Sequence, residues 1–332
     1  MRIGVVGAGA VGGWIGISLA ASGRHQLSAL ARGTTLAALR AAPWQMTMGG
    51  KTLTAKVQAS DHPGELGEQD VVIIALKGPA LASVAPLITP LIGARTVIIP
   101  TMNGLPWWFL LGGGGELPST RLSSVDPSGS IAEAIPFASL LGSVVHASAS
   151  SPAPGLVTHK AGNRLIFGEP DGSRSARLDG IAELFRSEGF EIETSECIQR
   201  DIWYKLWGNM TMNPISAITG ATCDRILDDP LVNGFVLRVM QEAAAVGARI
   251  GCRIEERGED RNKVTRRLGA FKTSMLQDVE AGRPLEIDHL LGAPREIADK
   301  LHIPTPNMDA LLGLTRLFAQ KRGLYPDIPE SS

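Results

Sequence analysis

The sequence predicts an α/β N-terminal domain over residues 1–196, built on a doubly wound parallel sheet with an antiparallel sheet extension, and an all-α C-terminal domain over residues 197–332. Three observations predict this fold. A short apolar strand runs directly into a glycine-rich turn and a helix of small residues. Further apolar strands follow at intervals, and from Cys197 onward only helical periodicity remains.

Composition limits the kinds of partner that the chain can have. The 332 residues, 44% hydrophobic and 20% charged, suffice for two domains with cores of their own. A net charge of −1 provides no field that would attract nucleic acid or an anionic membrane surface, so we expect a small-molecule partner. Cys197, Cys223 and Cys252 stand far apart without metal-ligand spacing. We therefore expect no metal, no disulfide framework and a reducing, cytoplasmic location.

The first strand and the turn after it predict a dinucleotide site. Residues 2–6, "RIGVV", are followed by "GAGAVG", which places glycines in a GxGxxG pattern between a strand and a helix. The first glycine permits a tight turn, the second allows close approach of a pyrophosphate, and the third lets the helix pack on the strand. This Rossmann-type motif assigns cofactor binding to Gly7, Ala8, Gly9, Ala10, Val11 and Gly12. The same glycines argue against a signal peptide in this apolar run.

The end of the second strand indicates which dinucleotide is bound. Residues 26–32, "QLSALAR", lack the carboxylate that usually binds the ribose 2′-hydroxyl of NAD, and Arg32 stands there instead. A guanidinium suits a 2′-phosphate, so we expect NADPH. The alternative is a solvated arginine at a strand end.

Two further strands carry polar residues at their ends. The apolar stretch 70–80 includes Lys77, and the stretch 94–105 includes Asn103-Gly104. Parallel strands bind ligands at their carboxyl ends, so both residues are cofactor candidates. Alternatively, Lys77 is a solvated strand end and Asn103-Gly104 is only a turn.

An unusual aromatic run follows these strands. Trp107-Trp108-Phe109 precedes a loop of four glycines. We interpret it as a lid or pocket wall, or as an insertion packed on hydrophobic surface or on a second subunit.

The rest of the first domain reads as short alternating strands over 140–171, an amphipathic helix over 173–189 and a last strand over 190–196. The strands contain His146 and His159, which we interpret as ordinary half-buried histidines because no second ligand or paired acid is near in sequence. The second domain is predicted to contain helices at roughly 198–220, 229–251, 257–281, 286–301 and 306–322. A cleft between two such domains is the usual place for a substrate.

The stretch "KLWGNMTMNP" places Lys205, Asn209 and Asn213 four residues apart, on one helical face. Burying these groups without partners would cost a few kcal/mol, an objection that a polar substrate removes. The alternative is a solvated polar stripe. Further along, "KTSMLQDVEAGRPLEID" places Ser274 and Glu286 on either side of a turn. Spacing alone does not bring them to Lys205.

Taken in order, "GAGAVG", "LKGPA", "MNG", "KLWGNMTMNP" and "SMLQDVEAGRPLEID" resemble the ketopantoate reductase family across nearly the whole chain. The resemblance implies NADPH-dependent reduction of a 2-oxo acid to a 2-hydroxy acid, most directly 2-dehydropantoate to pantoate in pantothenate biosynthesis. It implies Lys205 as the catalytic acid and Asn209, Asn213, Ser274 and Glu286 as substrate-binding residues. On the cofactor side it adds Arg32, Lys77, Asn103, Ser148 in "VVHASA", and Glu286 to the glycine turn.

Two departures from the family leave the substrate open. A further asparagine expected about ten residues after Asn213 is replaced by the neighbourhood "GATCDR", and shorter members lack the aromatic run. One alternative is a Rossmann dehydrogenase of the glycerol-3-phosphate, 6-phosphogluconate or opine type. Another is a noncatalytic NADPH sensor, which would have no use for Lys205 and its companions. A homodimer is compatible with the sequence, which does not determine the oligomeric state.

Overall fold

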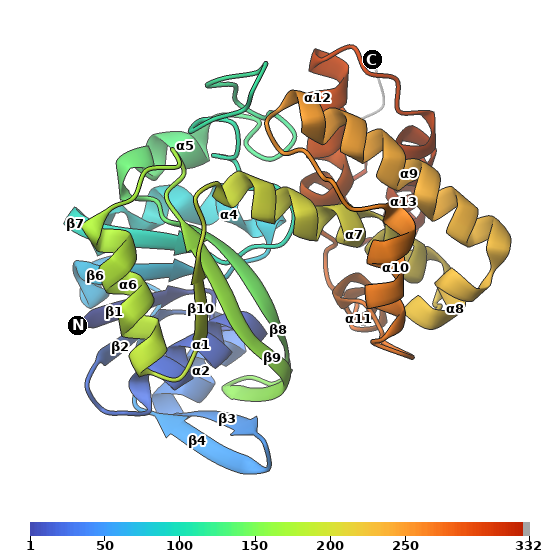
Figure 1. Ribbon diagram of the computed structural model, residues 1–332. Helices are drawn as coiled ribbons and strands as arrows, with labels where there is room; N and C mark the ends of the chain where they lie inside the picture. The colour runs from blue at the N-terminus through green and yellow to red at the C-terminus, as the bar shows by residue number, and fades with distance from the viewer. Residues whose placement is uncertain (328–332) are drawn as a thin grey trace. The chain divides into compact units, whose positions relative to one another are not determined.

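Five strands from the first third of the chain form a fully parallel sheet in the order β5-β2-β1-β6-β7 (Figure 1). The computed structural model describes residues 1–327. Strand order reverses at β1, which pairs with β2 on one side and β6 on the other. The predicted doubly wound sheet is therefore confirmed, with its switch point at the carboxyl end of β1. The strands are β1 (Arg2–Val6), β2 (Gln26–Leu30), β5 (Gln58–Ser60), β6 (Gln69–Ile74) and β7 (Ile92–Pro100).

A second sheet contains the predicted antiparallel strands. Strands β8 (Gly142–Ala153) and β9 (Leu156–Gly168) pair antiparallel, as expected, but β9 also runs parallel to β3 (Trp44–Met48) and β10 (Glu191–Thr194). Strand β4 (Lys51–Ala55) completes the order β10-β9-β3-β4. The antiparallel pair thus belongs to a separate mixed sheet instead of extending the parallel one. The β3–β4 hairpin, which has no counterpart among the predicted elements, turns through Gly49 and Gly50, both with positive φ.

Helix α1 (Ala10–Ala20) packs against both sheets, which explains its small residues. A Cβ on Gly12 would lie 2.2 Å from the Gly7 carbonyl oxygen, whereas one on Gly13 would lie 2.4 Å from the Val157 side chain in the second sheet. The next two residues, Trp14 and Ile15, are almost fully buried in the shared core. The glycine-rich turn is consequently anchored on two sides.

The remaining helices of this part of the chain connect the strands. They are α2 (Gly33–Ala41), α3 (Pro63–Leu66), α4 (Gly78–Val84), the 3₁₀ helix η1 (Ala85–Leu91), α5 (Ser130–Ala134), the 3₁₀ helix η2 (Phe137–Ser139) and α6 (Ala176–Ser187).

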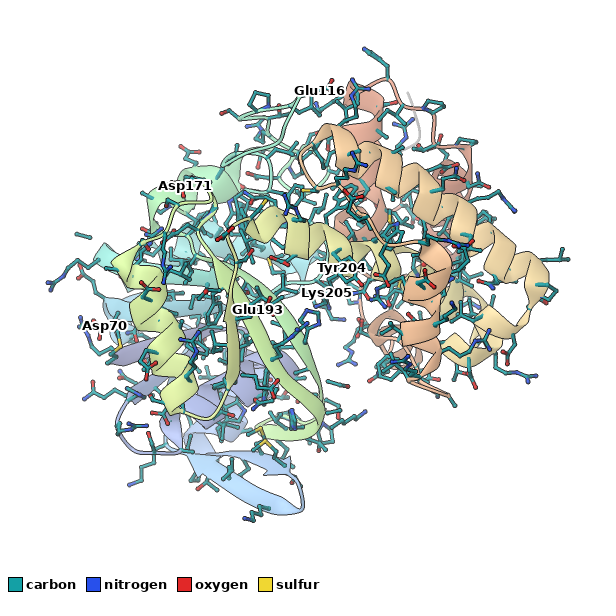
Figure 2. All side chains as sticks on the ribbon, in the orientation of Figure 1. Asp70, Glu116, Asp171, Glu193, Tyr204 and Lys205 are labelled. Atoms are coloured by element: carbon teal, nitrogen blue, oxygen red, sulfur yellow. The ribbon has the colours of Figure 1, made fainter. Side chains whose placement is uncertain are left out.

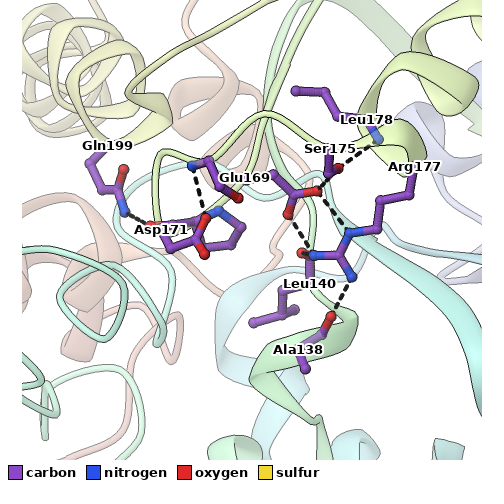
Figure 3. Close-up of polar contacts among 10 residues, drawn as sticks. Ala138, Leu140, Glu169, Asp171, Ser175, Arg177, Leu178 and Gln199 are labelled. Carbon is purple, nitrogen blue, oxygen red and sulfur yellow. Dashed lines mark hydrogen bonds and ion pairs between the residues drawn. The ribbon is translucent and has the colours of Figure 1, made fainter.

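An ion pair joins Glu169, the residue directly after β9, to Arg177 of α6 (Figure 3). The Glu169 carboxylate, 3% exposed, accepts from Arg177 Nε at 2.8 Å and from Ser175. Arg177 also donates to the carbonyl oxygens of Leu140, at 2.9 Å, and Ala138. Because a buried carboxylate is stable only when its acceptor sites are satisfied, this cluster fixes the start of β8 relative to α6.

The second part of the chain is helical, as predicted. Its helices are α7 (Ile198–Thr219), α8 (Cys223–Asp228), α9 (Pro230–Arg249), α10 (Gly258–Arg266), α11 (Ser274–Glu280), the π-helical turn η3 (Asp288–Gly292), α12 (Ala293–Lys300) and α13 (Pro306–Gln320). The single helix expected over 257–281 is wrong, because Gly269 adopts positive φ and Thr273 starts a new helix by accepting from the Leu276 N–H.

The chain divides into two compact units that differ from a simple cut in sequence. One comprises Met1–Met102 and Ser128–Asp201, and the other comprises Asn103–Pro127 and the chain from Ile202 onward. The division into a cofactor-binding domain over residues 1–196 and a substrate-binding domain over residues 197–332 stays a prediction.

The loop 103–127 is part of the helical unit. Its three aromatic rings, Trp107, Trp108 and Phe109, are at most 1% exposed, and Phe109 lies 6.0 Å from the Trp203 ring. The interpretation as a surface lid is therefore wrong, whereas an insertion packed on hydrophobic surface agrees with the burial of the rings. The rings are core residues.

Polar contacts fasten the same loop at two further places. The Glu296 carboxylate on α12 accepts from the backbone N–H and hydroxyl groups of Ser123 and Ser124, at 2.6–3.0 Å. Glu116, which Figure 2 labels, pairs with Arg249 at the end of α9. Within residues 1–327, no helix is long and apolar enough to cross a membrane.

Candidate active site

The glycine turn leaves the start of α1 open to an anion. Gly7 has φ +101°, and a Cβ there would lie 2.8 Å from the Ala75 backbone. Gly9 precedes the helix, is exposed and has open space where a Cβ would stand. No side chain caps α1 and no acid lies in its first turn, so its N–H groups and dipole can bind a pyrophosphate. These residues fit a dinucleotide.

Arg32 is exposed and stands two residues after β2, where it precedes the first turn of α2. That turn contains no acidic residue. The position thus offers a cation that suits a phosphate, and the turn behind it adds no carboxylate that would repel one.

Lys77 and Ser148 occupy different elements of the same unit. Lys77 follows β6 and precedes the first residue of α4, with its side chain partly buried. Ser148 lies in β8, opposite Ala161 and beside an irregularity in the pairing. Their contact with a cofactor stays a prediction.

Lys205 lies on α7 (Figure 2), and its amine donates to Asn103 Oδ1 at 3.0 Å. Burial lowers the pKa of Lys205 from 10.5 to about 8, while the Glu286 carboxylate opposes the shift. Asn103 lies about 100 residues before Lys205 in the chain, and Glu286 lies about 80 residues after it. The three residues therefore act on one another. An ammonium with a pKa near neutrality is suited to donate a proton.

The opposite side of α7 fixes its rotation. Trp203, Leu206 and Trp207 are buried, and the Trp207 indole N–H donates to the Met240 carbonyl at 2.7 Å. Tyr204, exposed next to Lys205, donates to Glu256 and lies under the Arg261 guanidinium. These contacts hold α7 in the orientation in which Lys205 faces Asn103.

The remaining substrate candidates are placed as follows. Asn209 and Asn213 lie one and two turns after Lys205 on α7, the first partly buried and the second 5% exposed. Ser274 is the exposed first residue of α11, after the capping Thr273. That these three residues act together with Lys205 on a substrate stays a prediction.

Matches to a known family span both parts of the chain. Residues 3–108 match the model described as ketopantoate reductase PanE/ApbA, and residues 197–319 match the model of its C-terminal part. The chain belongs to the ketopantoate reductase family. Its members are oxidoreductases that use a nicotinamide cofactor and act on a small keto acid.

Relatives resemble the chain over its full length. A 2-dehydropantoate 2-reductase from Mesorhizobium japonicum is 42% identical over 98% of this chain and 100% of its own. A Ralstonia solanacearum protein assigned as a ketopantoate reductase has a solved structure that is 57% identical, with a TM-score of 0.94 over 98% of this chain and 99% of its own. The 2-dehydropantoate 2-reductase of Geobacter metallireducens is 27% identical, with a TM-score of 0.82 over 96% and 99% of the two chains.

Gly104 and His289 support Asn103, and sequence reasoning missed His289. The Leu105 N–H donates to the His289 carbonyl at 2.8 Å, and a Cβ on Gly104 would lie 2.4 Å from that same oxygen. Gly104, with φ +76°, was noted only as part of a turn. Nothing in the sequence indicated His289, a buried imidazole in η3 whose pKa burial lowers to about 4. The π-helical turn thus carries the support for the Asn103 loop.

The two histidines interpreted above as half-buried, His146 and His159, lie in β8 and β9. The His159 ring stacks on Trp14 at 5.6 Å and lies 2.6 Å from the Gly162 carbonyl oxygen through Nε2. His146, in β8, pairs with Arg164 of β9 and is partly buried. Across residues 1–327, no three His, Cys, Asp or Glu side chains group as metal ligands would.

Proposed function

We propose that this chain reduces 2-dehydropantoate (ketopantoate) to pantoate with NADPH, as a cytoplasmic step of pantothenate biosynthesis. The observation that carries the proposal is the Lys205 ammonium, partly buried, bonded to Asn103 and next to Glu286. In a chain of this family, such an amine is well suited to protonate the oxygen of a carbonyl that is being reduced.

The proton chemistry follows from the surroundings of Lys205. When bound, the nicotinamide supplies a hydride to the C2 carbonyl carbon. The Lys205 ammonium stabilises the negative charge that develops on the carbonyl oxygen and then donates its proton to it. With a pKa of about 8, Lys205 is mostly protonated at neutral pH and gives up its proton more readily than an ordinary lysine. Asn103 and Glu286 keep the amine aimed.

Substrate recognition is assigned to groups on two helices. Asn209 and Asn213 would hold the hydroxyl or carboxylate of the 2-oxo acid from α7. Ser274 at the start of α11 would donate to the carboxylate. Glu286 would accept from a substrate hydroxyl or a nicotinamide-ribose hydroxyl.

Cofactor recognition is assigned to the first unit and to Asn103. The residues Gly7, Ala8, Gly9, Ala10, Val11 and Gly12 would hold the pyrophosphate, with Lys77 and Ser148 as further contacts. Arg32 would bind the 2′-phosphate, which makes NADPH the preferred cofactor. Asn103 accepts from Lys205 through Oδ1, which leaves its Nδ2 donor for the cofactor.

The test is a substrate panel. Loss of NADPH absorbance is followed with ketopantoate and with smaller and bulkier 2-oxo acids, for the wild-type protein and for Lys205→Met. We expect turnover of ketopantoate with the highest kcat/KM and none above background for the variant. If only other 2-oxo acids are turned over, one of them is the substrate and ketopantoate is not. NADPH binding without any turnover would favour a sensor over a reductase.

A further inference from the structure

The segment that carries Glu286 is fastened on both sides by the C-terminal part of the chain. On one side, the Leu285 N–H donates to the Leu324 carbonyl at 3.0 Å, and both residues are buried. On the other side, the Tyr325 hydroxyl lies 2.9 Å from each carboxylate oxygen of Asp288. Two neighbouring residues, Leu324 and Tyr325, therefore bracket Glu286.

The Asp288 carboxylate is held by two side chains. Besides Tyr325, it accepts from Arg316 Nη2 at 3.1 Å, and the Arg316 guanidinium lies 5.9 Å from the Tyr325 ring centre. Asp288 is also the first residue of the π-helical turn η3. A π-helical turn is uncommon. The hydroxyl of Tyr325 contacts the first residue of this one.

We propose that Tyr325 is a positioning residue for Glu286: its bond to Asp288, together with the Leu324–Leu285 bond, keeps the Glu286 carboxylate next to the Lys205 ammonium. The inference rests on the proposed function in assigning Lys205 as the acid. The match to the family model ends at residue 319, so this support comes from residues beyond the matched region.

The charged groups around this contact make its effect measurable. Glu286 favours the charged form of Lys205, so a less firmly placed carboxylate lowers the pKa of that amine. Burial and Asp288 raise the pKa of Tyr325 to about 12, and burial lowers that of His289 to about 4. Neither Tyr325 nor His289 titrates near the pKa of Lys205. A change in the pKa of Lys205 therefore reports on the position of Glu286.

The experiment compares wild-type protein with Tyr325→Phe, which keeps the ring and removes the hydroxyl. The pH dependence of acetylation of the Lys205 amine by acetic anhydride is read by mass spectrometry of the peptide, with no substrate present. We expect the midpoint, near 8 in the wild type, to fall by about half a pH unit in the variant. The alkaline limb of kcat should shift equally, a loss of about threefold well above the midpoint, with KM nearly unchanged.

The matched control is Gln320→Ala. It removes the bond from Gln320 Nε2 to the Pro326 carbonyl, at 3.1 Å, from the same C-terminal segment without touching Asp288 or Leu285. We expect its Lys205 midpoint to match the wild type. A thermal melt on the same samples measures any purely structural effect, which would lower Tm and leave the midpoint in place.

Two outcomes would overturn the inference: a Tyr325→Phe midpoint equal to that of the wild type, or an equal shift in Gln320→Ala. Because labelling requires no turnover, it judges the contact even if no 2-oxo acid is reduced. In that case the proposed function fails on the substrate panel, independently of the positioning of Glu286.

Discussion

Burial disfavours the charged form of Lys205, so the charged amine lowers the free energy of unfolding. Its pKa falls from 10.5 in the unfolded chain to about 8 on folding. The destabilisation is complete below pH 8 and disappears as the pH rises through 10.5. A difference of this size corresponds to about 3 kcal/mol. Removing the amine would recover only part of this, on the order of 1–2 kcal/mol, because Asn103 then loses its donor.

Replacing Lys205 by Met should therefore stabilise the protein at neutral pH while abolishing reduction. We expect a gain of about 1–2 kcal/mol in the free energy of unfolding at pH 7 that shrinks towards pH 10.5. Urea denaturation at both pH values measures it. Exposed Lys56 provides the control, because Lys56→Met should change neither stability nor kcat. A gain that grows with pH would contradict the assigned direction.

The same pKa predicts how the rate of the reaction should depend on pH. If Lys205 donates the proton, kcat for 2-oxo acid reduction should be level below neutrality and fall about tenfold per pH unit above about 8. Initial rates at saturating substrate and NADPH across this range measure the limb. An alkaline limb near the pKa of an ordinary lysine would show that the acid is a different group.

The proposed contact of Arg32 with a 2′-phosphate can be tested by comparing the two nicotinamide dinucleotides. Arg32→Ala should raise KM for NADPH about tenfold to a hundredfold, because a charge-assisted bond to the 2′-phosphate is lost, and should leave KM for NADH nearly unchanged. Arg40→Ala is the matched control. Arg40 is an exposed arginine in the last turn of α2, the helix that Arg32 precedes. Equal losses for both cofactors would argue against a 2′-phosphate contact.

At the scale of elements, the approach of the Asn103 loop to η3 depends on Gly104. Gly104→Ala should lower kcat as well as stability, because the new methyl group would lie 2.4 Å from the His289 carbonyl oxygen. Gly50→Ala is a close control: both glycines have φ +76°, but nothing surrounds Gly50 within 4 Å. Kinetics and thermal melts of both variants are compared, with about 1 kcal/mol lost from φ alone. Equal effects on kcat would remove the close approach as the cause.

Local signals in the sequence predicted those elements whose structure is local. The turn from Gly7 to Gly12 follows from backbone requirements contained in six residues, and its position between β1 and α1 was predicted correctly. The break before α11 was missed, since a capping Thr273 inside a helical pattern is a weak signal. Pairing of β9 with β3 requires contact between residues over 100 positions apart, which periodicity does not encode.

The candidate site shows the same limit. The spacing of Lys205, Asn209 and Asn213 on one helix was visible in the sequence, because helical periodicity is local. The bond from Lys205 to Asn103 was not, since it joins two segments about 100 residues apart. Family resemblance indicated both residues but gave Asn103 a role towards the cofactor alone.

At the scale of the whole molecule, the assembly is a prediction with a direct test. Leu314 and Leu317 on α13 are 59% and 55% exposed, which is unusual for large apolar side chains one turn apart. We expect a homodimer, with a mass of twice 35.1 kDa by light scattering. Leu317→Glu should shift the equilibrium towards monomer, and exposed Leu87→Glu in the other unit should not. A mass of 35.1 kDa at micromolar concentration would contradict the prediction.

The loop that supplies Trp107, Trp108 and Phe109 to the helical unit has a consequence for how the protein is made. These rings leave the ribosome roughly 90 residues before Trp203, which is roughly 5–20 s at ordinary rates of synthesis. During that interval the nascent chain displays three adjacent aromatic side chains whose packing partners have not yet been translated. The segment is therefore the natural target for a chaperone that binds hydrophobic residues, and slower translation downstream of it would lengthen the exposure.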